Sequence, residues 1–299
     1  IYAVWGFIPQ LNLGMVVKKD VSELVQKKVL FSFFIFLSIT LALISLFLFI
    51  YGFLHVKGKG MTAKGDDVLR VRKHFLHILF WLSLFVLSLT FLYQQFVHYQ
   101  ATNFVEKQEE QFLAIAEQQI DHSLKNIEGI AYAFAKDYQT ERIKAAQIEQ
   151  RLDRDLREHP EILGVSVAYK PYKYAENKKL HAPFYYRSGE KIFQSSLDRY
   201  TDYAKPFNRE TSWYIPTLKE KRHWSQPFYE KLSQQLVVSF SVPFYGPKDT
   251  EEKDPLGIVT VYYPLSSIKK LVNYYDIGFS GYYFLLSDKG QYIYHPFDG

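Results

Sequence analysis

Two long stretches without a charged residue dominate the hydropathy pattern of the chain. The first, residues 29–54, has 26 residues, and the second, residues 75–97, is of similar length. A hydrocarbon core of about 30 Å needs roughly 20 helical residues to cross it. We therefore predict transmembrane helices at residues 29–56 and 75–97, because buried helices of soluble proteins rarely contain apolar runs this long. Neither stretch has the position or the cleavage pattern of a signal peptide.

The charges around these stretches predict an orientation in the membrane. The connecting segment, Lys57–Lys73, carries six basic and two acidic residues, whereas residues 103–111 carry three Glu and one Lys. The positive-inside rule places the connecting loop, residues 57–74, in the cytoplasm and both flanking segments outside. Lys27 and Lys28 at the other end of the first stretch weaken this asymmetry, but the loop has more basic residues. The alternative is the inverted topology, with residues 98–299 in the cytoplasm.

After the second stretch, residues 98–137 have the pattern of a long amphipathic helix. Apolar residues recur at intervals of three, four and seven, and Glu and Gln fill the other positions. This spacing makes one apolar stripe on a helix that continues directly from the predicted span. The stripe comprises Leu113, Ile120, Leu124, Ile127, Ala131 and Phe134. It packs either on its own domain alone or, along part of its length, also against a second copy.

The pattern then changes to alternating short helices and β-rich runs. A second amphipathic segment, residues 141–158, ends before Pro160. The segments predicted as extended are 162–170, 181–189, 235–245, 256–265 and 281–296, with a short helix at 266–276. A long helix followed by an antiparallel sheet indicates an α+β fold of the PAS type.

Composition restricts the chemistry that the chain can carry. The chain has no Cys, which excludes disulfides and thiol nucleophiles, and its nine His lack the spacing of a metal site. We find no catalytic motif and expect no cofactor. The net charge of +5 is concentrated between the two apolar stretches, so we expect a membrane and not a nucleic acid as partner.

Residues from about 98 to 299 resemble a double Cache domain, an extracytoplasmic sensor of bacterial signal transducers. The resemblance is carried by the Trp213-Tyr214 pair, by Trp224 with Pro227-Phe228, and by the strands VVSFSVPFYG and GIVTV. The run GYYFLLSDKGQYIYHP resembles the first hairpin of the membrane-proximal half of such domains. Residues 2–24 resemble the closing strands of a Cache domain, which commonly lead into a transmembrane helix.

This resemblance implies a division of the chain into sensors and spans. Because the chain begins at Ile1 without an initiator Met and stops within a strand-rich unit, we interpret it as part of a longer protein. The predicted segments are the end of a preceding Cache-like domain (1–28), the first span (29–56), the cytoplasmic loop (57–74), the second span (75–97), the stalk helix (98–137), the membrane-distal subdomain (138–279) and the start of the membrane-proximal subdomain (280–299).

The resemblance also implies a ligand site. In amino-acid-sensing members, an Arg and a Trp-Tyr pair hold the ligand carboxylate, and acidic residues hold its amine. The matching positions here are Arg209, Trp213, Tyr214 and Glu230, and the predicted ligand site also includes Trp224, Phe228 and Tyr262. Tyr262 stands where the family often has an Asp, which favours a carboxylate or ring-bearing ligand over a plain α-amino acid. The alternatives are an aromatic core for the Trp and Tyr residues and a surface salt bridge for Arg209.

We therefore predict the input region of a membrane-bound signal transducer that forms a homodimer through its stalk and transmembrane helices. A small ligand would bind outside the cell, and the output domain would be a kinase, a PPM-type phosphatase, a diguanylate cyclase or a chemoreceptor module. The alternative is a membrane protein or enzyme whose outer domain grips a cell-envelope polymer. An enclosed aromatic pocket would favour sensing, and an exposed aromatic groove would favour the polymer.

Overall fold

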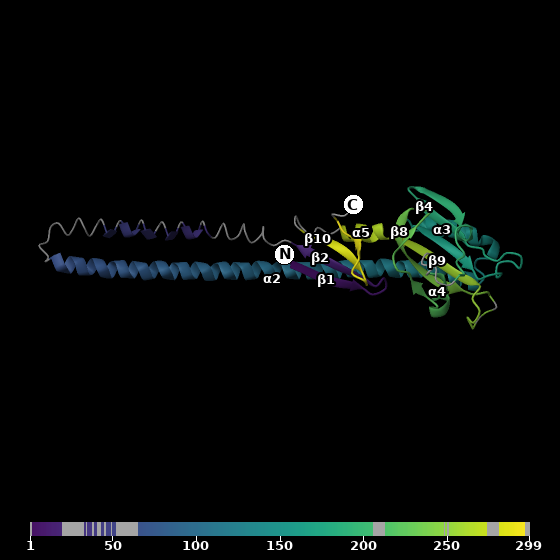
Figure 1. The fold of residues 1–299 in the computed structure, drawn as a ribbon, viewed down its shortest axis with the longest axis horizontal. Helices are drawn as coiled ribbons and strands as arrows, with labels where there is room; N and C mark the ends of the chain where they lie inside the picture. The colour runs from purple at the N-terminus through teal and green to yellow at the C-terminus, as the bar shows by residue number, and fades with distance from the viewer. Residues whose placement is uncertain are drawn as a thin grey trace. The chain divides into compact units, whose positions relative to one another are not determined.

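A computed structural model describes most of the chain (Figure 1). It covers residues 2–19, 65–205, 213–273 and 281–296, apart from 248 and 250, and parts of the stretch between 33 and 51. The described residues form two compact units. The first contains residues 2–4, 18–19, 65–110 and Gly281, and the second contains the remainder from 5–17 and from 111 onward.

The longest element is the helix α2 (Gly65–Gln139), which has 75 residues. All six residues of the predicted stripe are buried, so the prediction of an apolar helix face between Leu113 and Phe134 is confirmed. The helix ends where Glu141 adopts a left-handed conformation, with φ of 58°. For that reason the second predicted helix begins later than residue 141, as a 3-10 turn (Ala145–Gln147) followed by α3 (Ile148–Glu158).

A seven-stranded sheet forms the centre of the second unit, and its named neighbours are antiparallel (Figure 1). The strand order is β5-β4-β3-β9-β8-β6, and β7 also pairs with β8. The strands are β3 (Gly164–Tyr169), β4 (Pro183–Ser188), β5 (Lys191–Ser196), β6 (His223–Trp224), β7 (Phe228–Glu230), β8 (Gln235–Phe244) and β9 (Gly257–Pro264). The predicted strands at 162–170, 235–245 and 256–265 are thereby confirmed, and 181–189 contains β4.

The two faces of this sheet meet different elements. Alternate residues of a strand point to opposite faces. Phe240 and Phe244 of β8 point towards α2, where their rings contact Tyr132 and Tyr138 at 5.7 and 5.2 Å. Val237 points to the other face and joins a buried cluster with residues of the helix α4 (Tyr214–Glu220). The sheet is therefore covered on both sides, which explains why every residue of β3 and β9 is buried.

A buried ion network fixes α3 against the end of α2. Arg151 of α3 bonds to Asp137 of α2 and to Asp155 of its own helix, both at 2.5 Å. Arg151 also lies over the ring of Phe134. Removing one partner of a buried pair leaves an uncompensated charge, so this network makes the packing of the two helices specific.

A second, four-stranded sheet joins segments from the two ends of the chain. Its order is β1-β2-β10-β11, with β1 (Tyr2–Ile8), β2 (Leu13–Lys19), β10 (Gly281–Ser287) and β11 (Tyr292–Tyr294). Leu13, Met15 and Val17 alternate with more exposed neighbours and are fully buried. The predicted hairpin at 281–296 is confirmed, and α5 (Leu265–Asn273) matches the predicted helix before it. The division into two sensors stays a prediction.

No helix among the described residues meets the combined requirements of length and hydropathy for a membrane span. The first predicted span, residues 29–56, lies largely outside the described residues. The second, residues 75–97, lies within α2. What the structure supports is an α+β fold with a long helix and antiparallel sheets.

Replacing Ile120 by Ala should lower the free energy of unfolding by about 2–5 kcal/mol, because the side chain is buried on the α2 stripe and its removal leaves a cavity. Ile115→Ala on the same helix should cost less than about 0.5 kcal/mol, because Ile115 is exposed. Urea unfolding followed by circular dichroism measures both. Equal losses of unfolding free energy in the two variants would show that the buried stripe of α2 does not contribute more to stability than the exposed face.

Candidate functional site

A cavity of about 90 Å³ lies against the face of the large sheet opposite α2. This volume holds several water molecules or one small organic molecule. Strand residues from β7 and β9 form part of its wall, and residues 197–201 together with Trp213 form another part. The lining residues are Leu197, Tyr200, Thr201, Trp213, Phe228, Tyr229, Glu230, Lys231, Leu232 and Tyr262. Four of the seven predicted site residues are thus brought together.

Aromatic rings form the apolar wall of the cavity. Tyr262 is 2% exposed and lies between Phe184 and Phe228, with ring centroids at 5.0 and 6.3 Å. Gly164, opposite Tyr262 in the sheet, makes room for this arrangement, because a Cβ there would lie 2.7 Å from a ring carbon of Phe184. Trp213 is also buried and lines the same cavity.

Glu230 is the only acidic residue among those that line the cavity. One carboxylate oxygen, Oε1, accepts the backbone N–H of Leu232 at 3.0 Å. The other, Oε2, accepts the N–H and the hydroxyl of Ser233, each at 2.6 Å. A carboxylate offers about four acceptor positions, so these three bonds leave room for one further donor. Glu230 therefore both holds the turn between β7 and β8 and can receive an ammonium or hydroxyl group.

Tyr262 supplies a neutral hydroxyl rather than a second negative charge. Burial raises its pKa, and the nearby carboxylate of Glu230 raises it further, against the effect of a hydrogen bond with Ser166. The phenol oxygen lies 3.5 Å from the hydroxyl oxygen of Ser166. At neutral pH this position can donate or accept a hydrogen bond but cannot pair with a cation.

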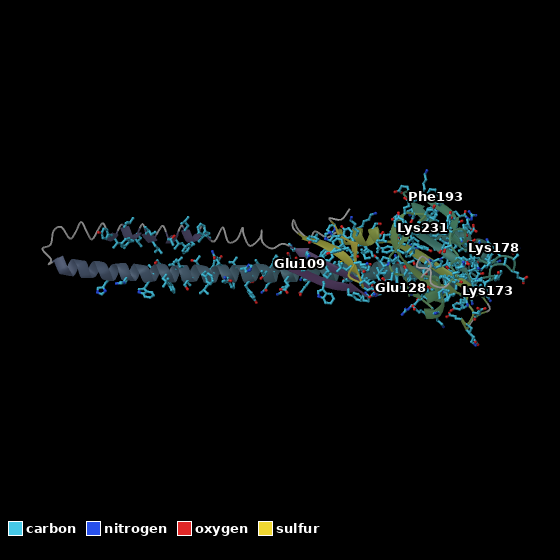
Figure 2. All side chains as sticks on the ribbon, in the orientation of Figure 1. Glu109, Glu128, Lys173, Lys178, Phe193 and Lys231 are labelled. Carbon is cyan, nitrogen blue, oxygen red and sulfur yellow. The ribbon has the colours of Figure 1, made fainter. Side chains whose placement is uncertain are left out.

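The structure adds a cation to the site that the sequence did not single out. Lys231 lines the cavity immediately after Glu230, and its side chain is exposed (Figure 2). The sequence could have indicated Lys231 only through its position directly after the predicted site residue Glu230. Tyr200 and Leu197 also line the cavity, but they follow β5 in a segment that carried no recognisable pattern.

Three predicted site residues are not among the residues that line the cavity. Arg209 lies outside the described residues. Tyr214 is buried beside Trp213, and its hydroxyl has no hydrogen-bond partner among the described residues. Trp224 contacts Phe240 on the face towards α2, and its indole N–H donates to Glu128 at 2.9 Å. All seven predicted residues, the four at the cavity included, stay predictions as ligand-binding residues.

Comparison with known families identifies the domain that contains this cavity. Residues 148–270 match the family described as methyl-accepting chemotaxis protein-like, first PDC sensor domain. This stretch includes the whole seven-stranded sheet and all the residues that line the cavity. The chain therefore contains a Cache-like sensor domain, as the resemblance predicted. No curated protein matches the chain.

Several solved structures are similar to the chain at low sequence identity. The extracellular domain of a protein described as a histidine kinase, soHK1S-Z6, is 18% identical, with a TM-score of 0.47 over 57% of this chain and 66% of that one. Methyl-accepting chemotaxis protein X is 17% identical, with a TM-score of 0.44 over 58% and 66%. The ligand-binding domain of the Campylobacter jejuni chemoreceptor Tlp3, in complex with L-valine, is 15% identical, with a TM-score of 0.41 over 57% and 64%. The chain spans just under two thirds of the length of these domains.

Replacing Tyr262 by Phe should reduce the loss of stability at alkaline pH. The folded pKa of Tyr262 is raised above the unfolded value of about 10, so its contribution is complete below pH 10 and is lost as the pH rises. Between pH 8 and 10.5 the variant should lose about 0.8 kcal/mol less than the unchanged chain. Urea unfolding at both pH values measures this difference. Tyr172→Phe, at an exposed position, serves as the matched control for the loss of a hydroxyl group.

Proposed function

We propose that residues 148–270 bind a small extracytoplasmic ligand in the cavity beside Tyr262, as the input of a membrane-bound signal transducer. The observation that carries the proposal is the cavity itself, which combines an aromatic wall with one carboxylate and one ammonium group. Ligand pockets are typically apolar concavities with a few convergent polar groups. The family match supports a sensory role for the same residues.

The charges of the cavity favour a small ligand that bears a carboxylate. Lys231 can pair with that carboxylate, and a charge-assisted hydrogen bond of this kind is stronger than a neutral one. Glu230 can accept one hydrogen bond from an amine or hydroxyl of the same molecule. The rings of Trp213, Phe228 and Tyr262 accommodate an apolar or ring-bearing group. Two structures of the ligand-binding domain of the chemoreceptor Tlp3 are complexes with L-valine and 4-methylisoleucine, so amino acids belong among the first compounds to test.

The alternative, a domain that grips a cell-envelope polymer, finds less support. Polymer binding needs a platform of exposed aromatic side chains. Trp213 and Tyr262, which line the cavity, are at most 3% exposed, so their rings cannot stack on an extended chain of sugars. Tyr200 and Tyr229 also line the cavity and are 61% and 59% exposed, so the preference for a small ligand rests on the buried rings.

The membrane location is part of the proposal. Between Ile78 and Tyr99, α2 exposes a succession of large apolar side chains, including Trp81, Phe85 and Phe91, each at least 60% exposed. Exposure of this apolar surface to water is unfavourable, whereas the hydrocarbon core of a bilayer solvates it. With residues 29–56 as the other span, the basic loop at 57–74 would be cytoplasmic and the sensor domain extracytoplasmic.

The proposal also covers the oligomeric state of the protein and the output domain that receives the signal. Residues 98–137 would serve as the stalk helix of a homodimer, and residues 1–28 and 280–299 would be parts of the preceding and the membrane-proximal sensor regions. The signal would pass to a kinase, phosphatase, cyclase or chemoreceptor output through the transmembrane helices. Such transmission requires that the ligand bind two conformations with different affinity.

A screen of amino acids and small carboxylates, L-valine included, should find a compound that raises the unfolding temperature of the purified chain. A ligand at 100 times its Kd adds about 2.7 kcal/mol of stability. Lys231→Met should weaken binding of a carboxylate ligand about tenfold or more, because the charge-assisted bond is lost. Isothermal titration calorimetry measures the change.

Two variants serve as controls for this screen. Lys191→Met, on the exposed strand β5, should leave binding unchanged. Arg209→Met distinguishes between the two cations that could bind the ligand carboxylate. If the predicted Arg209 holds the ligand, Arg209→Met lowers the affinity and Lys231→Met leaves it unchanged. A properly folded chain that no compound in the screen stabilises would overturn the proposed function.

A reporter fusion tests the orientation of the chain in the membrane. Alkaline phosphatase inserted after Gly60 should be inactive, and inserted after Gly290 it should be active, because the enzyme requires an oxidising compartment to form its disulfides. The reverse pattern would place residues 98–299 in the cytoplasm and contradict the proposal.

A further inference from the structure

The segment from His223 to Glu230 runs along the outer edge of β8 and changes face along the way. At its start, Trp224 is opposite Phe240, and further on Phe228 is opposite Val237. Between these pairs, the three residues 225–227 face only the two residues 238–239. This is a β-bulge, in which one strand carries an extra residue.

The bulge decides where the two aromatic side chains point. Residues four apart on a regular strand share a face. The extra residue shifts this alternation, so that Trp224 lies on the face of Phe240 and α2, whereas Phe228 lies on the face of Val237 and the cavity. A bulge of this kind can re-aim a side chain beside a binding site.

Hydrogen bonds hold the bulge at Ser225, which is buried. Its backbone N–H donates to the carbonyl of Ser239, and its hydroxyl oxygen accepts the N–H of Ser239, each at 2.9 Å. The Ser225 side chain thus replaces a backbone acceptor at this point of the ladder. Because these bonds restrain the bulge, a displacement of Trp224 at one end of the segment is transmitted to Phe228 at the other end.

One end of this segment is attached to α2. The indole N–H of Trp224 donates to Oε1 of Glu128 at 2.9 Å, and the Trp224 ring packs on Phe240 at 5.0 Å. Both Trp224 and Glu128 are half-buried, which strengthens a hydrogen bond to a charged acceptor. The position of Glu128 on the helix is labelled in Figure 2.

The other end of the segment is the wall of the cavity. Phe228, Tyr229 and Glu230 of β7 line it, and Glu230 continues the connection through its bonds to Leu232 and Ser233. Only three residues separate the contact with α2 at Trp224 from the first cavity residue, Phe228.

We infer that Glu128 of α2 is a positioning residue for the cavity, acting through its hydrogen bond to Trp224 and the bulged segment 224–230. The inference rests on the proposed function, since it gives the ligand site a direct connection to the long helix. If α2 shifts, the cavity wall shifts with it, and by linkage a ligand that moves the wall must bias the helix to the same extent.

Hydrogen–deuterium exchange of the purified 299-residue chain, without any added ligand, tests this inference. Glu128→Ala should speed exchange in peptides covering residues 225–233 about tenfold, since a hydrogen bond to a charged group is worth at least that factor. Exchange in β3 should not change. Glu128→Gln keeps an oxygen that accepts from the indole and should restore most of the protection.

A double variant identifies the bond itself. Trp224→Phe removes the donor and keeps a ring, and should also speed exchange about tenfold. The combination Glu128→Ala with Trp224→Phe should be no faster than either single change, because both remove the same interaction. Additive effects would overturn the inference.

The matched control is Glu149→Ala. Glu149 accepts a hydrogen bond from Gln194 at 2.7 Å and so joins α3 to the opposite edge of the same sheet. Its loss should leave residues 225–233 as protected as before. The inference is wrong if Glu149→Ala loosens residues 225–233 as much as Glu128→Ala does, or if Glu128→Ala leaves them unchanged. Since no ligand is present, these outcomes are independent of the ligand screen, whose failure would overturn the proposed function alone.

Discussion

The burial of both faces of the central strands constrains everything else in the sensor domain. Antiparallel sheets commonly leave one face to solvent, but here α2 and α3 cover one face, and α4 together with Leu197 and Tyr203 covers the other. The face towards α2 carries large apolar side chains such as Phe240 and Phe244. The opposite face carries a row of small hydroxyl residues across three strands, formed by Ser166, Thr260 and Ser241, all fully buried. The cavity lies next to this row, in register with Tyr262.

The polar groups of the cavity follow from the same constraint. A carboxylate this close to a buried sheet needs hydrogen-bond donors, and Glu230 obtains three from the turn that its own strand enters. Its carboxylate is therefore held in one position by the turn of its own strand. Tyr262 stays neutral because burial opposes its ionisation. The result is a cavity with the hydrogen-bonded carboxylate of Glu230, the ammonium group of the exposed Lys231 and an aromatic wall.

The connection between this site and α2 is short because the strands are short. The β6–β7 edge contacts the helix at Trp224 and the cavity at Phe228, and a single extra residue separates the two orientations. The buried Arg151 network attaches α3 to the end of the same helix. The sheet thus contacts α2 at its β6 edge, through Phe240 and Phe244 of β8, and through α3.

The sequence alone determined the features that depend on local periodicity. The buried stripe from Leu113 to Phe134 follows from helical spacing, and β8 and β9 follow from continuous β-branched and aromatic runs, because burial on both faces selects apolar residues at every position. Family resemblance predicted a ligand site of seven residues, and four of them, Trp213, Phe228, Glu230 and Tyr262, line one cavity. Only the tertiary structure shows that Trp224 faces the helix. The strands β6 and β7 have two and three residues, which are too few to reveal in the sequence that the edge contains an extra residue. The tertiary structure also decided that Lys231, Tyr200 and Leu197 meet at the cavity, since only long-range pairing brings β5, β7 and β9 together.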